Sequence, residues 1–152
     1  MRAAALLLLL AALHVAPPQA VAQAVPGVHS EEMERAIAKA RRTLPAFWER
    51  VRANEPSETG YAVKIVASDQ HGVEHLWLSR PRMRGGRLVG TIDTQPRIVR
   101  SLRQGQELPI NQDAIIDWIY FRNGRIVGNE TGRAMIRHLP REEAEKMLKL
   151  YE

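Results

Sequence analysis

The sequence predicts an α+β fold, in which a small, twisted, antiparallel sheet is flanked by an N-terminal and a C-terminal helix. Apolar residues recur at helical spacing after Ser30, and from Tyr61 onward the apolar period falls to two. Tight turns join the strand-like segments, and such turns connect antiparallel neighbours. Five or six short, twisted strands could also close partly into an SH3-like half-barrel. The chain has no cysteine, so apolar packing must hold this fold without disulfides.

Residues 1–24 have the pattern of a secretory signal peptide. Arg2 precedes an apolar run from Ala3 to Ala12, and two small-x-small sites follow a pair of prolines. We expect cleavage after Ala24 and export to the periplasm or the medium, with residues 25–152 forming one globular domain. The apolar run is much shorter than the roughly 20 residues that cross a bilayer, so no membrane span is expected.

Residues 25–60 are expected to form a leader and an N-terminal helical segment. Ser30 fits an N-cap position, and acidic residues follow it where the helix dipole favours them. Pro45 is expected to break the helix, so that a second short helix ends before Pro56. The helical stripe comprises the apolar residues Met33, Ile37, Ala40, Leu44, Phe47, Trp48 and Val51.

The sheet is expected to begin with a hairpin. Alternating apolar residues predict a strand from Tyr61 to Ser68, and Asp69–Gly72 then forms a turn into a partner strand at Val73–Ser79. A basic turn at Pro81–Gly86 follows, and a third strand is predicted at Arg87–Asp93.

A short helical segment at Pro96–Arg103, ended by Gly105, is expected to precede the remaining strands. Asn123-Gly124 is a strong type I′ hairpin signal and joins the last two of these strands. The expected strands are Glu107–Ile110, Ala114–Phe121 and Arg125–Val127.

The tail from about Gly132 is predicted to be helical, with a break at Pro140. Its apolar residues should face the rest of the domain. They are Ala144, Met147, Leu148 and Tyr151.

The string His71-Gly72-Val73-Glu74-His75 matches the zinc pattern H-x-x-E-H letter for letter. That pattern operates on a helix, where residues four apart share one face. Here it falls on a turn and a strand, and residues four apart in a strand are separated by roughly 13 Å. We therefore expect no metal site and no cofactor.

Asp117 lies in an apolar, strand-like stretch next to Trp118. A carboxylate in such a position is usually buried and hydrogen-bonded for stability. We expect Arg133 or a loop N–H group to be its partner.

A basic run lies in the middle of the chain, and its density of positive charge fits an anionic surface or the acidic surface of an envelope protein. Aromatic residues do not interleave with it, as they do in platforms for single-stranded nucleic acid, and export removes the protein from cellular nucleic acid. We expect no nucleic-acid partner. The run consists of Arg80, Arg82, Arg84, Arg87, Arg97, Arg100 and Arg103.

With these motifs in view, the stretch from Tyr61 to Arg133 resembles the DUF2314 family, the YegJ-like proteins of bacteria. The matching features are Tyr61-Ala62-Val63-Lys64, Glu74-His75-Leu76-Trp77-Leu78, Gly90 with Pro96, Leu102 with Gly105, Ile116-Asp117-Trp118, and Gly128-Asn129 with Thr131 and Arg133. Residues 40–47 are similar to the helix that often precedes this domain.

The resemblance implies that residues 61–152 form a YegJ-like domain without an established activity. It also implies that Glu74-His75, and not His71, belongs to the shared pattern. At Gln106 the chain departs from the family, in which an acidic residue commonly follows the glycine.

The predicted function is a small exported binding module, and we favour binding over catalysis because no nucleophile with a base stands out. Its ligand and oligomeric state stay open, and its expected partner is an envelope protein or an anionic surface. The alternatives are a hydrolase that uses Glu74 with His75, or Asp117, as acid–base groups, and a structural accessory protein of the envelope. The candidate ligand-binding residues are Glu74, His75, Trp77, Asp117, Trp118, Asn129 and Arg133.

Overall fold

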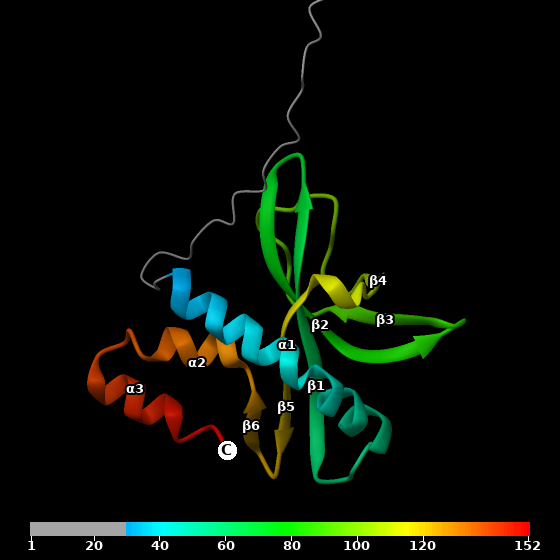
Figure 1. The fold of residues 1–152 in the computed structure, drawn as a ribbon. Coiled ribbons are helices and arrows are strands. Elements are labelled where there is room, and N and C mark those ends of the chain that lie inside the picture. Colours follow the sequence, from blue (N-terminus) through cyan, green and yellow to red (C-terminus); the bar gives the residue numbers. More distant parts are fainter. Residues whose placement is uncertain (1–29) are drawn as a thin grey trace, which may run out of the picture.

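A computed structural model describes residues 30–152 (Figure 1). The predicted signal peptide and the first residues of the leader lie outside the described residues. The α+β fold is confirmed. The helices are α1 (Ser30–Ala53), α2 (Glu130–Ile136) and α3 (Arg141–Leu148), with a 3-10 turn η1 (Gln112–Ala114). The strands are β1 (Glu58–Asp69), β2 (Gly72–Arg84), β3 (Arg87–Ile92), β4 (Glu107–Pro109), β5 (Ile115–Arg122) and β6 (Arg125–Gly128).

The six strands form one antiparallel sheet in the order β4-β3-β2-β1-β5-β6. β4 and β6 are its two edges, so the sheet is open over the described residues and the SH3-like closure is not confirmed. Near the C-terminus, Tyr151 forms a bridge to Ile126 and covers part of the β6 edge. Within residues 30–152, no helix is long and apolar enough to cross a membrane.

The core lies on one face of the sheet. There α1 packs across β1 and β5, with the ring centroids of Phe47 and Trp118 5.3 Å apart. The loop between β3 and β4 covers the other end of the same face with the buried side chain of Val99. The buried cluster comprises Ala40, Phe47, Val63, Ile65, Ala67, Leu76, Leu78, Ile92, Val99, Ile110, Ile115, Trp118 and Tyr120.

The predicted helix break at Pro45 is wrong, because α1 runs through this residue without interruption. A proline inside a helix removes one backbone hydrogen bond, here to the carbonyl of Arg41. Ala40 and Phe47, on either side of it, are both 1% exposed against the sheet. In addition, the indole Nε1 of Trp118 donates to the Ala40 carbonyl at 3.0 Å. Packing on both sides of the proline therefore outweighs the lost bond.

The predicted turn at Pro81–Gly86 is wrong in its first half, since β2 continues to Arg84. The pairing with β3 shifts by one residue between Ser79 and Arg82, and Arg80 adopts a left-handed φ of 52°. This bulge accommodates Pro81, which has no N–H to give to a neighbouring strand. β2 and β3 therefore extend away from the body of the molecule as a projecting hairpin (Figure 1).

The predicted helical segment at Pro96–Arg103 is also wrong, because these residues form an irregular loop. Its N–H groups bond to carboxylates of the β1–β2 hairpin instead of to a helical carbonyl ladder. The turn at Asn123-Gly124 is confirmed, with φ values of 49° and 77° that fit type I′.

The C-terminal tail is helical, with the predicted break at Pro140. Its expected apolar face is only partly confirmed. Tyr151 is buried at 4% exposure, but Met147 and Leu148 are 38% and 43% exposed. α3 has no buried residue, because α2 is the one helix or strand of the described residues that packs closely against it.

Candidate functional site

The sheet face opposite α1 carries a row of side chains across three strands. The β1–β2 register sets Lys64 opposite Trp77, and the β1–β5 register sets Lys64 opposite Asp117. Side chains directly opposite each other in an antiparallel pair lie on the same face, with Cβ atoms about 5 Å apart. Val66 and Phe121, on the same face, are 39% and 36% exposed. We call this surface the open face.

The ammonium group of Lys64 is half-buried between a hydroxyl and an aromatic ring. Its Nζ donates a 2.7 Å hydrogen bond to Thr131 Oγ1 and lies 4.8 Å from the centroid of the Trp77 ring, within cation–π range. Burial lowers the pKa of Lys64, and the charge of Asp117 opposes that shift. An ammonium carries three N–H donors, and among the described residues Thr131 accepts one of them. Two donors are left for a ligand.

Asp117 is fully buried and its carboxylate is satisfied by α2. It accepts the backbone N–H groups of Trp118 at 2.9 Å, Glu130 at 3.1 Å and Thr131 at 2.8 Å, and the Thr131 hydroxyl at 2.5 Å. The prediction of a backbone N–H partner is therefore right in kind, but the Glu130 and Thr131 donors belong to helix α2 and not to a loop. The predicted partner Arg133 is wrong.

Two of these N–H groups belong to the first turn of α2, whose N-cap residue Asn129 makes no side-chain cap. Asp117 thus caps α2 from the neighbouring strand. Because the Thr131 hydroxyl gives its proton to Asp117, its oxygen is free to accept from Lys64. The buried carboxylate therefore fixes the position of the lysine through one intermediate hydroxyl.

His75 lies on the open face, two residues before Trp77 on the same strand and opposite Val66. Burial and the positive charge of Lys64 lower the pKa of His75, so the ring is neutral near pH 7. A neutral imidazole both donates and accepts a hydrogen bond. Together the lysine donors, the indole face and the imidazole can hold a ligand with an anionic or carbonyl oxygen and a flat apolar part.

Glu74 lies on the other face of β2 from His75, because consecutive strand residues point to opposite faces. Its carboxylate accepts the backbone N–H groups of Arg97, Ile98 and Val99 at 2.9 to 3.2 Å. Burial alone would raise the pKa of Glu74, but these hydrogen bonds lower it. Glu74 and His75 therefore do not act together as an acid–base pair. Glu74 fastens the β3–β4 loop.

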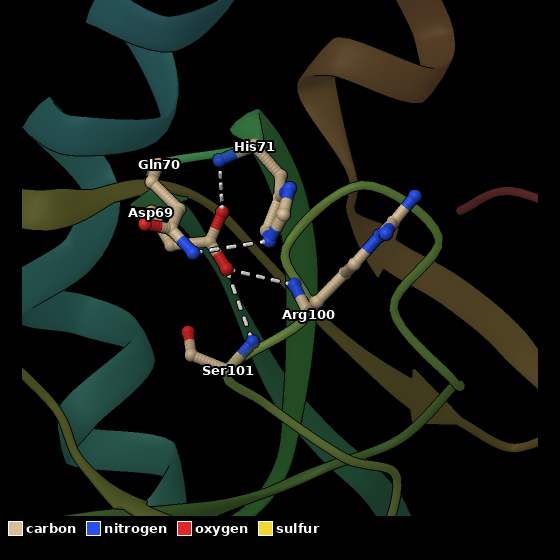
Figure 2. Close-up of a pocket in the computed structure, with 5 residues that line it drawn as sticks. All are labelled: Asp69, Gln70, His71, Arg100 and Ser101. Atoms are coloured by element: carbon tan, nitrogen blue, oxygen red, sulfur yellow. Dashed lines mark hydrogen bonds between the residues drawn. The ribbon is translucent and has the colours of Figure 1, made fainter.

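Asp69 fastens the same loop from the tip of the β1–β2 hairpin. Its carboxylate accepts the backbone N–H groups of His71, Arg100 and Ser101 at 2.7 to 3.0 Å, while the Arg100 side chain extends away from it (Figure 2). With Gln70, these residues line an open hollow of about 370 Å³. Burial would raise the pKa of Asp69, and the three N–H groups lower it. We call Asp69 and Glu74 together the carboxylate clamp.

The zinc pattern that begins at His71 does not form a cluster. Among residues 30–152, no group of three or more His, Cys, Asp or Glu side chains is arranged to hold a metal ion. His71 lies in the exposed turn, and His75 follows on the open face.

Three of the predicted ligand-binding residues lie away from the open face. Trp118 is in the core, with its Nε1 bonded to the Ala40 carbonyl. Asn129 Nδ2 donates to the Tyr151 hydroxyl at 2.7 Å, and the Arg133 guanidinium lies 4.2 Å from the centroid of the Tyr151 ring. The structure thus brings together His75, Trp77 and Asp117, and separates the other four candidates from them.

The seven arginines of the basic run are exposed but fall into two groups. One group lies on the β2–β3 hairpin and the other on the β3–β4 loop. On the hairpin, Arg82 and Arg84 both pair with Glu107 of β4. The hairpin group is Arg80, Arg82, Arg84 and Arg87, and the loop group is Arg97, Arg100 and Arg103.

Sequence reasoning missed Lys64 and Thr131 as site residues. A signal for Lys64 was present, because the two-residue turn Gln70-His71 fixes the hairpin register and so places Lys64 opposite Trp77. No comparable signal existed for Thr131, whose contact with Lys64 joins residues 67 positions apart in the sequence.

The chain is similar to uncharacterized bacterial proteins. A family described as "Uncharacterized protein conserved in bacteria (DUF2314)" matches residues 30–150. The uncharacterized protein YegJ of Escherichia coli (strain K12) is 32% identical over 121 residues, which are 80% of this chain and 78% of YegJ.

A second relative is a putative ankyrin repeat protein of Neisseria meningitidis serogroup B. It is 28% identical over 121 residues, which are 74% of this chain. The match covers 48% of that protein, so the chain spans about half of its length. No solved structure is significantly similar to the chain.

Proposed function

This chain belongs to the DUF2314 family of uncharacterized bacterial proteins, and from that premise we propose that it is a small exported binding module that holds its ligand on the open face of the sheet. The observation that carries the proposal is the Lys64 ammonium, fixed between the Trp77 ring and the Thr131 hydroxyl with two donors unused by the described residues. A half-buried charge with a lowered pKa is more common at functional sites than elsewhere.

The ligand class follows from these groups. An ammonium bonds strongly to a carboxylate or another anionic oxygen, with a net gain of about 2 kcal/mol for a charged hydrogen bond. The indole of Trp77 offers a flat apolar surface beside it, and His75 can add one neutral hydrogen bond. We propose a small carboxylate with a flat or apolar body.

The geometry favours binding over the hydrolase alternative. Glu74 and His75 lie on opposite faces of the sheet, and the carboxylate of Glu74 is occupied by three backbone N–H groups. Both oxygens of Asp117 accept hydrogen bonds in the interior, so neither is available to take a proton from water on the open face.

We also propose export, on the strength of the signal-peptide pattern in residues 1–24. The test is fractionation of a bacterial culture followed by mass spectrometry of the protein's N-terminus. The expected product begins at Val25 and lies outside the cytoplasm. An intact N-terminus in the cytoplasmic fraction would rule out export.

An envelope protein is proposed as a further partner. The Neisseria relative is described as a putative ankyrin repeat protein, and ankyrin repeats form extended binding surfaces in other proteins. The description of this relative supports the proposal that the present chain has a protein partner. Crosslinking in intact cells, with capture of the same envelope protein from replicate cultures, is the measurement that checks it.

The ligand proposal is tested by nuclear magnetic resonance with benzoate as the probe and acetate as its counterpart without a ring. Benzoate in the millimolar range should shift the indole N–H signal of Trp77. The shift should be lost in Lys64→Met, which keeps the aliphatic stem, and kept in Lys146→Met on exposed α3. Melting curves confirm that Lys64→Met is folded. An unmoved Trp77 signal, or an equal shift in Lys64→Met, contradicts the proposed site.

A further inference from the structure

The β2–β3 hairpin beyond the bulge at Arg80 projects from the molecule and ends in the turn Gly85-Gly86 (Figure 1). We call residues 80–88 the arm. Both turn glycines have left-handed φ values, 54° and 76°. A Cβ built on either glycine has no neighbour within 4 Å. The end of the arm is therefore narrow and open to close approach by a surface.

One face of the arm is basic. Arg82, Arg84 and Arg87 lie on it, and the register sets Arg84 directly opposite Arg87. Like charges in such a pair destabilise a hairpin, so this pairing does not serve the fold. Glu107 bonds to both Arg82 and Arg84. Among residues 30–152, this one carboxylate leaves most of the positive charge of the arm without an ion-pair partner.

The opposite face of the arm is apolar and extends the core outward. Met83 is paired with Leu88, and Leu88 packs against the buried cluster. Met83 is 66% exposed, more than any other large apolar side chain in the described chain. A flexible thioether side chain at the end of a projecting hairpin has no role in packing the body of the protein.

We propose that the arm docks the protein on an anionic phospholipid surface. Met83 enters the boundary between headgroups and acyl chains, and Arg84, Arg87 and Arg82 bind lipid phosphates. Basic residues attract a protein to an anionic leaflet, and an apolar side chain adds to the binding when it is buried there. Guanidinium groups suit phosphates because they form paired hydrogen bonds.

A lipid surface fits the arm better than an acidic protein. A stable protein interface buries about 800 Å² on each partner and contains a cluster of buried side chains. The arm instead offers one exposed apolar side chain on one face and arginines on the other, at a narrow end. This docking does not involve Lys64 or its ligand, so a failure of the ligand proposal would not contradict the docking proposal.

The test is cosedimentation of the purified protein, whose N-terminus has first been established. Binding to vesicles of mixed phosphatidylglycerol and phosphatidylcholine is compared with binding to vesicles of phosphatidylcholine alone. Binding to the anionic vesicles only, weakened by added salt, is expected. Arg84→Gln with Arg87→Gln should weaken it about thirtyfold, and Met83→Ser should weaken it about fivefold. The matched control, Arg100→Gln with Arg103→Gln on the β3–β4 loop, should weaken it less than about threefold.

Several outcomes overturn the proposal. These are absent binding to anionic vesicles, equal binding to neutral ones, or equal losses in the arm variant and the loop control. Binding to soluble poly-glutamate that matches vesicle binding, with no effect of Met83→Ser, would replace the lipid with an acidic protein as the partner. Melting temperatures check that each variant is folded, and removal of the Arg84–Arg87 pair should not lower the melting temperature.

Discussion

Glu58 lies at the start of β1 with its side chain fully buried, and it joins three elements. Arg50 of α1 and Arg122 of β5 donate to its carboxylate at 2.8 to 3.1 Å, and the Tyr61 hydroxyl donates at 2.7 Å. Burial alone would raise the pKa of Glu58, but these hydrogen bonds lower it to about 2. Burial and the neighbouring carboxylate raise the pKa of Tyr61 to about 12.

We expect Glu58→Gln to destabilise the protein at pH 7 by about 2 kcal/mol. This is less than the ~3–5 kcal/mol of a fully buried pair, because Arg50 and Arg122 are 36% and 34% exposed. A carboxyl whose folded-state pKa is depressed adds stability above its ordinary pKa, and this contribution is lost as the pH falls toward 2.

Urea unfolding at pH 7 and near pH 2 measures this effect. The difference in the free energy of unfolding between wild type and Glu58→Gln should be large at pH 7 and small near pH 2. Glu55→Gln, at an exposed position three residues earlier, is the control and should change little at either pH. A difference that does not depend on pH would show that the ion pairs are not its source.

Some side-chain contacts could be predicted from the sequence and others could not. Burial of Asp117 and its need for hydrogen-bond partners could be predicted from its apolar flanks, but not the N–H groups of α2 that bond to it. The contact between Lys64 and Thr131 could not, because it depends on where α2 lies beside β5 and not on any local pattern. Glu58 also left no signal, since an isolated glutamate before a strand is usually exposed.

Among the elements, α1 shows tertiary packing outweighing a local rule. We expect Pro45→Ala to stabilise the protein by about 1 kcal/mol, because it restores the N–H that bonds to the carbonyl of Arg41. The melting temperature should rise by roughly 4 °C. Pro109→Ala, in exposed edge strand β4, should leave it nearly unchanged. No rise in the melting temperature of Pro45→Ala would contradict the expected cost of the missing hydrogen bond.

The β3–β4 loop depends on the carboxylate clamp. We expect Glu74→Gln to lower the hydrogen-exchange protection of the amides of Arg97, Ile98 and Val99 about tenfold, because a neutral oxygen replaces a charged acceptor. Amide exchange followed by nuclear magnetic resonance measures it. The unchanged Asp69 should keep Ser101 protected.

The clamp also makes the loop sensitive to acid. The pKa values of Asp69 and Glu74 are lowered in the folded protein, so their contribution to loop stability exists above the ordinary carboxyl pKa of about 4 and is lost below it. Protection of the loop should fall on acidification before the core opens. Glu107→Gln is the control and should not change the amides at residues 97–101. Equal protection in Glu74→Gln and wild type would refute the clamp.

At the scale of the whole molecule, Tyr151 ties the C-terminus to the sheet edge. It is 4% exposed, its hydroxyl accepts from Asn129, and its backbone pairs with Ile126. We expect Tyr151→Ala to cost about 3 kcal/mol through the cavity it leaves, and Tyr151→Phe to cost about 1 kcal/mol. Thermal unfolding of both variants measures the ratio of these two losses of stability. Similar losses in the two would assign the effect to the hydroxyl and not to packing.

Much of the fold could be predicted because it depends on local chemistry. Alternation identified the β1–β2 hairpin, and Asn123-Gly124 identified the β5–β6 turn. The errors lie where distant residues compete with local preferences: the bulge that carries β2 through Pro81, and the loop whose N–H groups the carboxylate clamp takes from a helix. α3 differs too, because its apolar residues find no partner in the described part of the chain.

The sequence by itself determined the α+β class, the succession of the six strands and the family, since these follow from hydrophobic period, turn residues and motif order. Only the tertiary structure decided which motif residues meet. It placed Glu74 and His75 on opposite faces, gathered Trp77, Lys64 and Asp117 on one, and divided the arginines between an arm and a loop. The physical reason is that strand register and helix docking decide which side chains lie close together. Both arise from contacts between residues far apart in the chain.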